Sequence, residues 1–245
     1  MKFTIHYIER VDSTNKYAFA LCKRGEANEG EVFVAKEQYK GRGYQNNIWL
    51  SDPGKNLTFS LVIQPHFVLP AQQFAITQFI SLAILDQLKK LLPDEIIKIK
   101  WPNDVYINEK KVCGVLVQNT ITGNTFDYAI IGVGLNVHQK DFPVELPNPT
   151  SLIYYLKSEL NLREFLNDLL SSVNRRYEQL IFSPELLKEA YLQHLYRFKK
   201  MSEFEDANGK FLGEIKGIGD FGELLITDDT GHLRKYNFKE IEFAN

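Results

Sequence analysis

The sequence predicts an α+β fold, in which helices pack on a mixed, mostly antiparallel sheet and a small β-barrel follows at the C-terminal end. Four strand-like segments succeed one another between residues 96 and 137, at intervals too short for the crossovers that parallel strands need. Apolar residues at helical spacing lie on both sides of this region. After residue 198 the pattern changes to short strands separated by Asn-Gly and glycine-rich turns. We therefore expect two domains, residues 1–197 and 198–245.

The first third of the chain predicts strands alternating with helices. Residues 2–8 alternate between apolar and polar side chains, which predicts a strand. The residues from Asp12 to Asn15 are of types that favour the N-terminus of a helix. Residues 38–48 contain few apolar side chains and two glycines, which predicts a long loop. The elements expected from these patterns are a strand over 2–8, a helix over 16–23, strands over 31–36 and 57–63, and a helix over 71–92 that Pro93 ends.

The middle of the chain predicts a run of hairpins, and helices follow. Strands are expected over 96–101, 104–108, 111–119 and 126–137, with turns at 108–110 and 122–124. Residues 138–150 contain three prolines and predict an irregular loop. Two amphipathic helices are then expected, over 162–177 and 184–195, the second with Pro184 in its first turn.

Composition narrows the function classes. The chain has 245 residues, and 29 Lys and Arg against 31 Asp and Glu give a net charge of −2. A general nucleic-acid binder is disfavoured, because neutralising phosphates requires a basic excess. An apolar fraction of 44% excludes a disordered chain. No apolar run reaches about 18 residues, so no membrane span is expected, and the N-terminus lacks a signal-peptide pattern. Two cysteines, Cys22 and Cys113, form neither a disulfide framework nor a zinc motif, which predicts a cytoplasmic location.

The first segment that could carry chemistry is Gly41-Arg42-Gly43, which lies within the expected long loop. Glycines let backbone N–H groups approach a phosphate or carboxylate closely, and an arginine between them can pair with an anion through two hydrogen bonds. Taken alone, the segment fits a surface turn better than a binding loop, since short glycine motifs are common. Taken alone, Trp49 is interpreted as an aromatic residue of the core. Stacking of a nucleobase on its ring is the less favoured alternative.

The second segment runs from Lys100 to Gly114. It begins with Lys-Trp-Pro-Asn-Asp, in which Pro102 restricts the backbone at a junction between strands. Lys111 opens an apolar strand and can point its ammonium into a pocket, although a solvated hairpin tip explains it equally well. Gly114 in the middle of a strand indicates the close approach of a ligand or of another backbone.

The third segment is the apolar strand from Ile130 to Val137. Gly132 and Gly134 lie at alternate positions and clear one face of side chains, on which a flat ligand can lie; glycines that serve packing are the alternative. The pattern lacks the third glycine of a dinucleotide fingerprint, and no P-loop motif is present. The five histidines show no metal-ligand spacing.

Together, in this order and spacing, the segments resemble the motifs of the biotin protein ligases. The resemblance covers most of residues 1–195, and the last fifty residues resemble the small SH3-like barrel of that family. It implies a catalytic domain of the class II aminoacyl-tRNA synthetase type. Because the chain starts at the catalytic motifs, we expect no winged-helix DNA-binding domain. The matching residues are Ser13-Thr14-Asn15, Gln38, Gly41-Arg42-Gly43-Tyr44 with Trp49, Lys100 to Asp104, Lys111 with Gly114-Val115-Leu116, and Gly132 with Gly134 and Asn136.

The resemblance implies a two-step reaction in which biotin and ATP give biotinyl-5′-AMP, and a lysine of a biotin carboxyl carrier protein then accepts the biotinyl group. The catalytic residues it implies are Lys111, Arg42 and Asp104, and Asp104 is also the candidate Mg²⁺ ligand. The biotin contacts it implies are Ser13, Thr14, Asn15, Gln38, Gly41, Arg42, Gly43, Tyr44, Lys111, Gly114, Leu116 and Gly132. The ATP contacts it implies are Arg42, Trp49, Asn103, Lys111, Gly134 and Asn136.

The sequence departs from the family pattern at Tyr44, where a second arginine is usual, and at Gln45 to Asn47, where Gly-Arg is usual. Two consequences of Tyr44 are open: weaker retention of the adenylate, or a loop closed by packing of the ring on biotin or on Trp49. Two other functions also remain open, namely a lipoate or octanoate protein ligase of the same superfamily and a non-catalytic biotin-binding protein. DNA and membranes are not expected as partners, and a homodimer is compatible with the sequence.

Overall fold

The computed structural model describes residues 1–44 and 47–244, and Gln45 and Asn46 of the unusual loop segment lie outside the described residues. Its main feature is a seven-stranded mixed sheet with the order β1-β2-β3-β7-β6-β5-β4. The strands are β1 (Thr4–Val11), β2 (Glu31–Gln38), β3 (Leu57–Ile63), β4 (Ile97–Lys100), β5 (Asp104–Ile107), β6 (Lys110–Thr122) and β7 (Thr125–Leu135).

One pair in this sheet is parallel. The strand β1 pairs with β2 in parallel, and the helix α1 (Thr14–Lys23) supplies the crossover between them. The other five pairings of the sheet are antiparallel, and short turns connect β4 through β7 as expected. The predicted α+β class with a mixed, mostly antiparallel sheet is confirmed.

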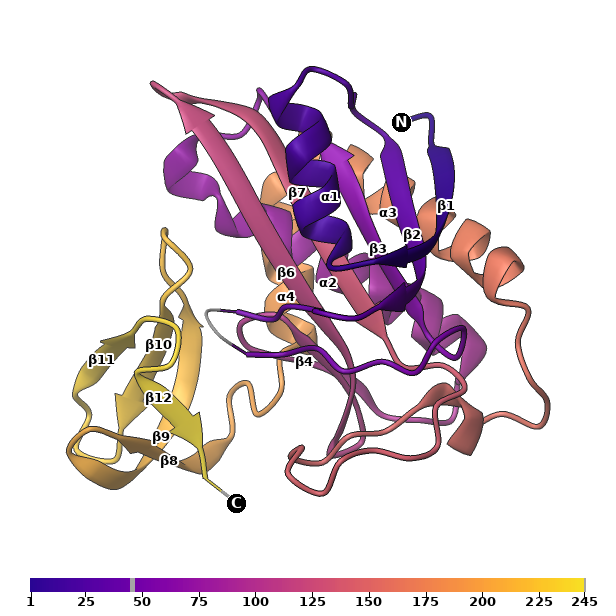
Figure 1. Cartoon of the computed structure of the whole chain (residues 1–245). Coiled ribbons are helices and arrows are strands. Elements are labelled where there is room, and N and C mark those ends of the chain that lie inside the picture. The colour runs from indigo at the N-terminus through magenta and orange to yellow at the C-terminus, as the bar shows by residue number, and fades with distance from the viewer. Residues whose placement is uncertain (45–46, 245) are drawn as a thin grey trace.

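Helices cover both faces of the sheet, with α1 on one face and α2 (Phe74–Leu91) on the other (Figure 1). The helix α1 packs through Ala18 on Phe33, Val62 and Ile130. The helix α2 is mostly buried, because it lies between the sheet and the helices α3 (Leu162–Phe182) and α4 (Pro184–His194). None of the described helices is both long enough and apolar enough to cross a membrane.

Helix ends deviate from the predicted ones for local reasons. The helix predicted from residue 71 begins at Phe74, because Pro70 starts a short 3₁₀ turn over Pro70–Gln72 first. The helix α3 runs to Phe182, five residues beyond the predicted end, and α4 begins at Pro184 as expected.

The C-terminal residues form a separate five-stranded antiparallel sheet, called the C-terminal sheet below (Figure 1). Its own apolar side chains include Phe204, Ile215 and Ile226, all fully buried. The short strands predicted after residue 198 are therefore confirmed, and they form a sheet of their own. The domain boundary at residue 197 stays a prediction. The strands are β8 (Met201–Asp206), β9 (Gly209–Ile218), β10 (Leu224–Asp228), β11 (Leu233–Tyr236) and β12 (Ile241–Phe243).

Candidate functional site

A cavity of about 770 Å³ opens where α1, the long loop after β2, the first half of β6 and the end of β7 meet. Its size is within the range of pockets that hold nucleotide- or cofactor-sized ligands. The predicted site residues that line it are Ser13, Thr14, Asn15, Gln38, Arg42, Gly43, Tyr44, Trp49, Asn103, Asp104, Lys111, Gly114, Leu116, Gly132, Gly134 and Asn136. Motifs spread over more than 120 residues of sequence thus meet in one place.

Gly41 is the predicted site residue that does not line the cavity. Its N-terminal and C-terminal neighbours fold back on each other, and a side chain at this position would meet the carbonyl oxygen of Trp49 at 2.4 Å. The Trp49 N–H donates a hydrogen bond of 3.1 Å to the Gly41 carbonyl. Gly41 therefore lets the two arms of the loop lie against each other.

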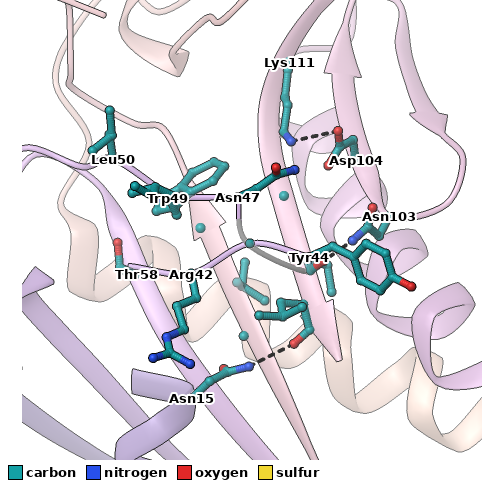
Figure 2. Close-up of a pocket in the computed structure, with 18 of the residues that line it drawn as sticks. Asn15, Arg42, Tyr44, Asn47, Trp49, Leu50, Thr58, Asn103, Asp104 and Lys111 are labelled. Carbon is teal, nitrogen blue, oxygen red and sulfur yellow. Dashed lines mark hydrogen bonds and ion pairs between the residues drawn. The ribbon is translucent and has the colours of Figure 1, made fainter. Parts of the chain in front are cut away.

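Lys111 and Asp104 form an ion pair in the wall of the cavity, with 2.8 Å between Nζ and Oδ2 (Figure 2). The pairing of β5 with β6 sets Asp104 opposite Gly114. A Cβ atom on Gly114 would lie 3.4 Å from Lys111 Nζ, so the bare glycine provides the space that the lysine side chain crosses. Both charged side chains are partly exposed and face the cavity.

Arg42 does not join this pair. Figure 2 shows its side chain extending toward Asn15, away from Lys111 and Asp104. Within residues 1–44 and 47–244 its guanidinium makes no hydrogen bond or ion pair. Of the three predicted catalytic residues, the structure brings two together and leaves the third free to meet an anion elsewhere in the cavity.

The glycines of β7 are covered by the protein's own side chains rather than by open space. A Cβ atom on Gly134 would meet the Trp49 indole at 2.3 Å, and one on Gly132 would meet Asn15 Oδ1 at the same distance. The sequence predicts a flat ligand on the bare face of this strand, with packing glycines as the alternative. In the structure the Trp49 ring covers Gly134 and the Asn15 side chain covers Gly132, as the packing alternative expects. The reading of Trp49 as an ordinary core residue is wrong, since the ring lines the cavity.

The start of α1 is held in place by two side chains and one backbone carbonyl from three other elements. Gln38 Oε1 accepts hydrogen bonds from the Thr14 N–H at 2.6 Å and from the Thr14 hydroxyl at 3.0 Å. The hydroxyl of Ser60 lies 2.7 Å from Thr14 Oγ1 and 2.6 Å from Asn15 Oδ1. Asn15 Nδ2 donates to the Leu116 carbonyl. Ser13 occupies the N-cap position but makes no capping bond, because Gln38 supplies the acceptor instead.

Two buried polar atoms of the cavity wall have no partner in the described part of the chain. They are Nε1 of Trp49 and Oδ1 of Asn136. The Asn136 side chain is fixed by its other end, since Nδ2 donates a 2.9 Å hydrogen bond to the Thr150 carbonyl. Leaving a buried donor and a buried acceptor unpaired costs free energy.

The cavity is poor in metal ligands. No group of three or more His, Cys, Asp or Glu side chains with metal-site geometry is present among the described residues. Asp104 is the one carboxylate among the described residues that line the cavity, and one of its oxygens is paired with Lys111. Cys113, behind this wall, is fully buried, and burial raises the pKa of its thiol, in agreement with its interpretation as a small apolar residue.

Sequence reasoning missed several residues of the site. Phe142 and Leu146 come from the proline-containing loop predicted as irregular; apolar side chains in such a loop are a usable signal. Phe238 and Lys239 reach the cavity from the turn 237–240 between β11 and β12, which no sequence pattern indicated. Ser60 is fully buried, and a hydroxyl in the otherwise apolar strand 57–63 could have marked it.

The chain is similar to known proteins over most of its length. Residues 7–136 match the model of the biotin/lipoate A/B protein ligase family. The bifunctional ligase/repressor BirA of Bacillus subtilis is 30% identical over 97% of this chain and 73% of its own length. The biotin–[acetyl-CoA-carboxylase] ligase of Paracoccus denitrificans is 29% identical over 91% of this chain and 94% of its own.

Among solved structures, the biotin protein ligase of Aquifex aeolicus in complex with biotin and ATP superposes with a TM-score of 0.81. It is 25% identical, and the match covers 99% of each chain. The family model, the sequence relatives and the fold agree, so the chain belongs to the biotin protein ligases within the biotin/lipoate A/B protein ligase family.

Proposed function

We propose that this protein is an ATP-dependent biotin protein ligase, which forms biotinyl-5′-AMP and transfers the biotinyl group to a lysine of a biotin carboxyl carrier protein. The observation that carries the proposal is the placement of Lys111. Its ammonium lies in the cavity wall 2.8 Å from Asp104 and 5.7 Å from the centroid of the Trp49 ring. A cation next to a flat aromatic surface fits a ligand that joins an anionic group to a base.

In the first step a carboxylate oxygen of biotin attacks the α-phosphorus of ATP, and the bond to the β-phosphate oxygen breaks to release pyrophosphate. Negative charge develops on the α-phosphate oxygens during this displacement. The ammonium of Lys111 can donate hydrogen bonds both to these oxygens and to the attacking carboxylate, where a fixed charge has its largest effect. Arg42 offers a second, unpaired cation that can hold a phosphate oxygen through two hydrogen bonds.

In the second step the amine of the carrier lysine attacks the acyl carbon of biotinyl-5′-AMP, and AMP leaves. The incoming amine arrives as an ammonium and must lose a proton before it can attack. Asp104 is the carboxylate in the wall, next to Lys111. We assign to it the orientation of the incoming ammonium and the acceptance of its proton.

Trp49 and Asn136 fit the adenine end of the nucleotide. The indole of Trp49 provides a flat surface, and base stacking on an aromatic ring contributes about 1–3 kcal/mol. Oδ1 of Asn136 can accept a hydrogen bond from the exocyclic amine of adenine. At the other end, the side chains of Ser13 and Gln38 can bond the ureido group of biotin.

Mg²⁺ would bind at this site together with ATP. The single carboxylate of the wall fits an ion whose ligands are mostly phosphate oxygens and water, and Asp104 is the residue that can contribute an oxygen. When bound, the ion neutralises phosphate charge; the contacts and proton movements described above belong to this chain's own residues.

The test is release of pyrophosphate from ATP, measured with biotin, lipoate or octanoate as the acid. We expect release with biotin alone, followed by labelling of a carrier domain that an avidin blot detects. Release with lipoate or octanoate instead would move the protein to the other branch of its family. Binding of biotin without any release would leave it a biotin-binding protein and refute the proposal.

A further inference from the structure

Three residues of the proline-containing loop, 148–150, lie beside the backbone of Lys111 and are called the clamp segment below. The Lys111 N–H donates a 2.8 Å hydrogen bond to the Asn148 carbonyl, and the Lys111 carbonyl accepts one of 2.8 Å from the Thr150 N–H. These two bonds form a parallel bridge between Lys111 and Pro149. Because the bridge uses the residues on either side of Pro149, the missing N–H of the proline costs no hydrogen bond.

The clamp segment takes the place beside β6 that β7 leaves. The strand β7 ends at Leu135, and just beyond this end the Asn136 N–H donates a 2.9 Å hydrogen bond to the Val112 carbonyl. Lys111 is the next residue of β6 toward the start of that strand, and its neighbour on this side is the clamp segment. The Asn136 side chain holds the segment in turn, since its Nδ2 donates a hydrogen bond to the Thr150 carbonyl.

The pairing of β6 with β5 on the other side contains a β-bulge at the same place. The register shifts between Val105 and Tyr106, and Val112 is the extra residue of β6. Val112 and its neighbour Cys113 are both fully buried, so the alternation of a regular strand is interrupted here. Bulges re-aim the side chains beside them, and the Lys111 side chain points into the cavity (Figure 2). Its direction therefore depends on an irregular stretch of backbone that the clamp segment supports.

Asn148 gives the clamp segment its course. Its φ angle is 47°, a left-handed conformation that asparagine and glycine adopt more readily than other residues. Pro147 precedes it and Pro149 follows it, and each proline restricts the backbone next to it. The Asn148 side chain is exposed and does not line the cavity, and within residues 1–44 and 47–244 it makes no hydrogen bond. Asn148 thus acts through its backbone.

We propose that Asn148 is a positioning residue, whose left-handed backbone sets the clamp segment beside Lys111 and thereby holds the lysine toward the reacting α-phosphate. This inference rests on the proposed function, because the phosphate is that of ATP. A lysine side chain is long and flexible, so its ammonium can be placed accurately only if the backbone that carries it is fixed. The clamp segment fixes this backbone through both of its polar groups, the N–H and the carbonyl.

The test compares two substitutions at Asn148. Valine is β-branched and resists the left-handed conformation, whereas glycine adopts it freely. At saturating biotin and ATP, we expect pyrophosphate release by Asn148→Val to slow about tenfold, the factor that corresponds to strain of this kind. Asn148→Gly should keep the rate of the wild type. The KM for biotin should change by less than about twofold in both variants, because a displaced Lys111 acts on the reacting groups and not on uniform binding.

Two further measurements separate the clamp from a general effect on the fold. In the Lys111→Ala background, Asn148→Val should cause no further slowing, because the clamp acts through that lysine. Hydrogen exchange of the Lys111 amide, followed by NMR on the full-length protein without ligand, reads the clamp without any activity. The amide should exchange slowly in the wild type and in Asn148→Gly, and faster in Asn148→Val.

Lys199→Val is the matched control. Lys199 also has a left-handed backbone, with a φ angle of 55°, and it does not line the cavity, so the variant carries the same kind of strain elsewhere. Its rate of pyrophosphate release should equal that of the wild type. An unchanged rate in Asn148→Val would overturn the inference, and so would an equal loss in Asn148→Gly or in Lys199→Val, additive losses with Lys111→Ala, or rapid exchange of the Lys111 amide in the wild type. A wild type that forms no biotinyl-5′-AMP would instead refute the proposed function, and the amide exchange would still decide whether the clamp exists.

Discussion

Gly134 and Trp49 lie so close together that a Cβ atom on the glycine would meet the indole ring at 2.3 Å. The pairing of β6 with β7 sets Gly134 directly opposite Gly114, and a Cβ atom there would lie 3.1 Å from the same indole. Two bare residues side by side on neighbouring strands therefore form a flat patch, on which the ring rests. The position of Trp49, and with it the shape of this side of the cavity, depends on this patch.

The first prediction concerns this patch. Gly134→Ala should displace the Trp49 ring, raise the KM for ATP, and lower stability by about 1–3 kcal/mol, the usual cost of an added group in a packed site. The measurements are pyrophosphate-release kinetics and thermal unfolding. The control is Gly217→Ala, another strand glycine, whose Cβ atom would meet only Leu225 at 4.0 Å. An unchanged KM for ATP in Gly134→Ala would show that the ring does not contact the nucleotide.

The second prediction concerns Lys111. Lys111→Ala should slow adenylate formation about a hundredfold or more, because a fixed charge at the reacting phosphate is lost, while the melting temperature changes little. Lys110→Ala is the matched control, since Lys110 is the exposed neighbour at the start of the same strand. Pyrophosphate release at a rate near that of the wild type, from folded Lys111→Ala, would remove this lysine from the catalytic assignment.

The third prediction separates the two steps. Asp104→Asn keeps the shape of the side chain but removes its charge and its ability to take up a proton. Transfer of the biotinyl group to a carrier domain should therefore slow by more than adenylate formation does. Single-turnover transfer from preformed biotinyl-5′-AMP, compared with pyrophosphate release by the same variant, measures the difference. If both rates fell by the same factor, Asp104 would act only by positioning Lys111 and would not take up the proton of the incoming amine.

Local sequence patterns were enough to predict the helices, strands and hairpins. They were not enough to predict which distant strands pair with each other. The hairpin of β5 and β6 follows from two strands and a short turn, which is why Asp104 and Gly114 could be assigned to one segment in advance. The pairing of β3 with β7 joins residues 57–63 to residues 129–135, and no local signal specifies it. Likewise, the parallel pairing of β1 with β2 depends on where α1 packs, which only the whole core decides.

The site shows the same division. Lys111, Gly132 and Gly134 could be identified from the sequence, because a charged residue or a glycine is unusual in an apolar strand. Phe238 and Lys239 are ordinary residues of a turn, and only the docking of the C-terminal sheet makes them part of the cavity wall. Arg42 lies between these cases: its loop was recognised, but the direction of its side chain follows from the fold of that loop.

The fourth prediction concerns the C-terminal sheet and pH. Asp228, 5% exposed, accepts hydrogen bonds from the Thr230 hydroxyl at 2.6 Å and the His232 N–H at 2.9 Å, and pairs with Arg234. The Thr230 and His232 hydrogen bonds and the Arg234 guanidinium hold the pKa of Asp228 well below its ordinary value. The ionised carboxylate thus stabilises the fold fully above the unfolded-state pKa of about 3.9, and this stabilisation fades as the pH falls below it.

Asp228→Asn should therefore unfold at a lower temperature than the wild type near neutral pH, and the gap should narrow below about pH 4. Melting curves recorded across this range for both proteins measure the gap. Asp229→Asn, a change at the exposed neighbouring carboxylate, should show no such pH-dependent difference. A gap that stays constant down to acid pH would mean that the charge of Asp228 does not contribute.

The pairing of β3 with β7 has a consequence for how the chain acquires activity. One half of the cavity is lined by residues between Ser13 and Trp49, and much of the other half by residues between Pro102 and Asn136. The pairing of β3 with β7 is the link that joins the strands of the two halves into one sheet. Contacts between segments far apart in sequence form slowly, since a long loop must close first. The binding site therefore comes into being late in folding, together with the complete sheet. A ligand that binds there adds its free energy to the stability of the finished chain, so biotin and ATP should also raise the temperature at which the protein unfolds.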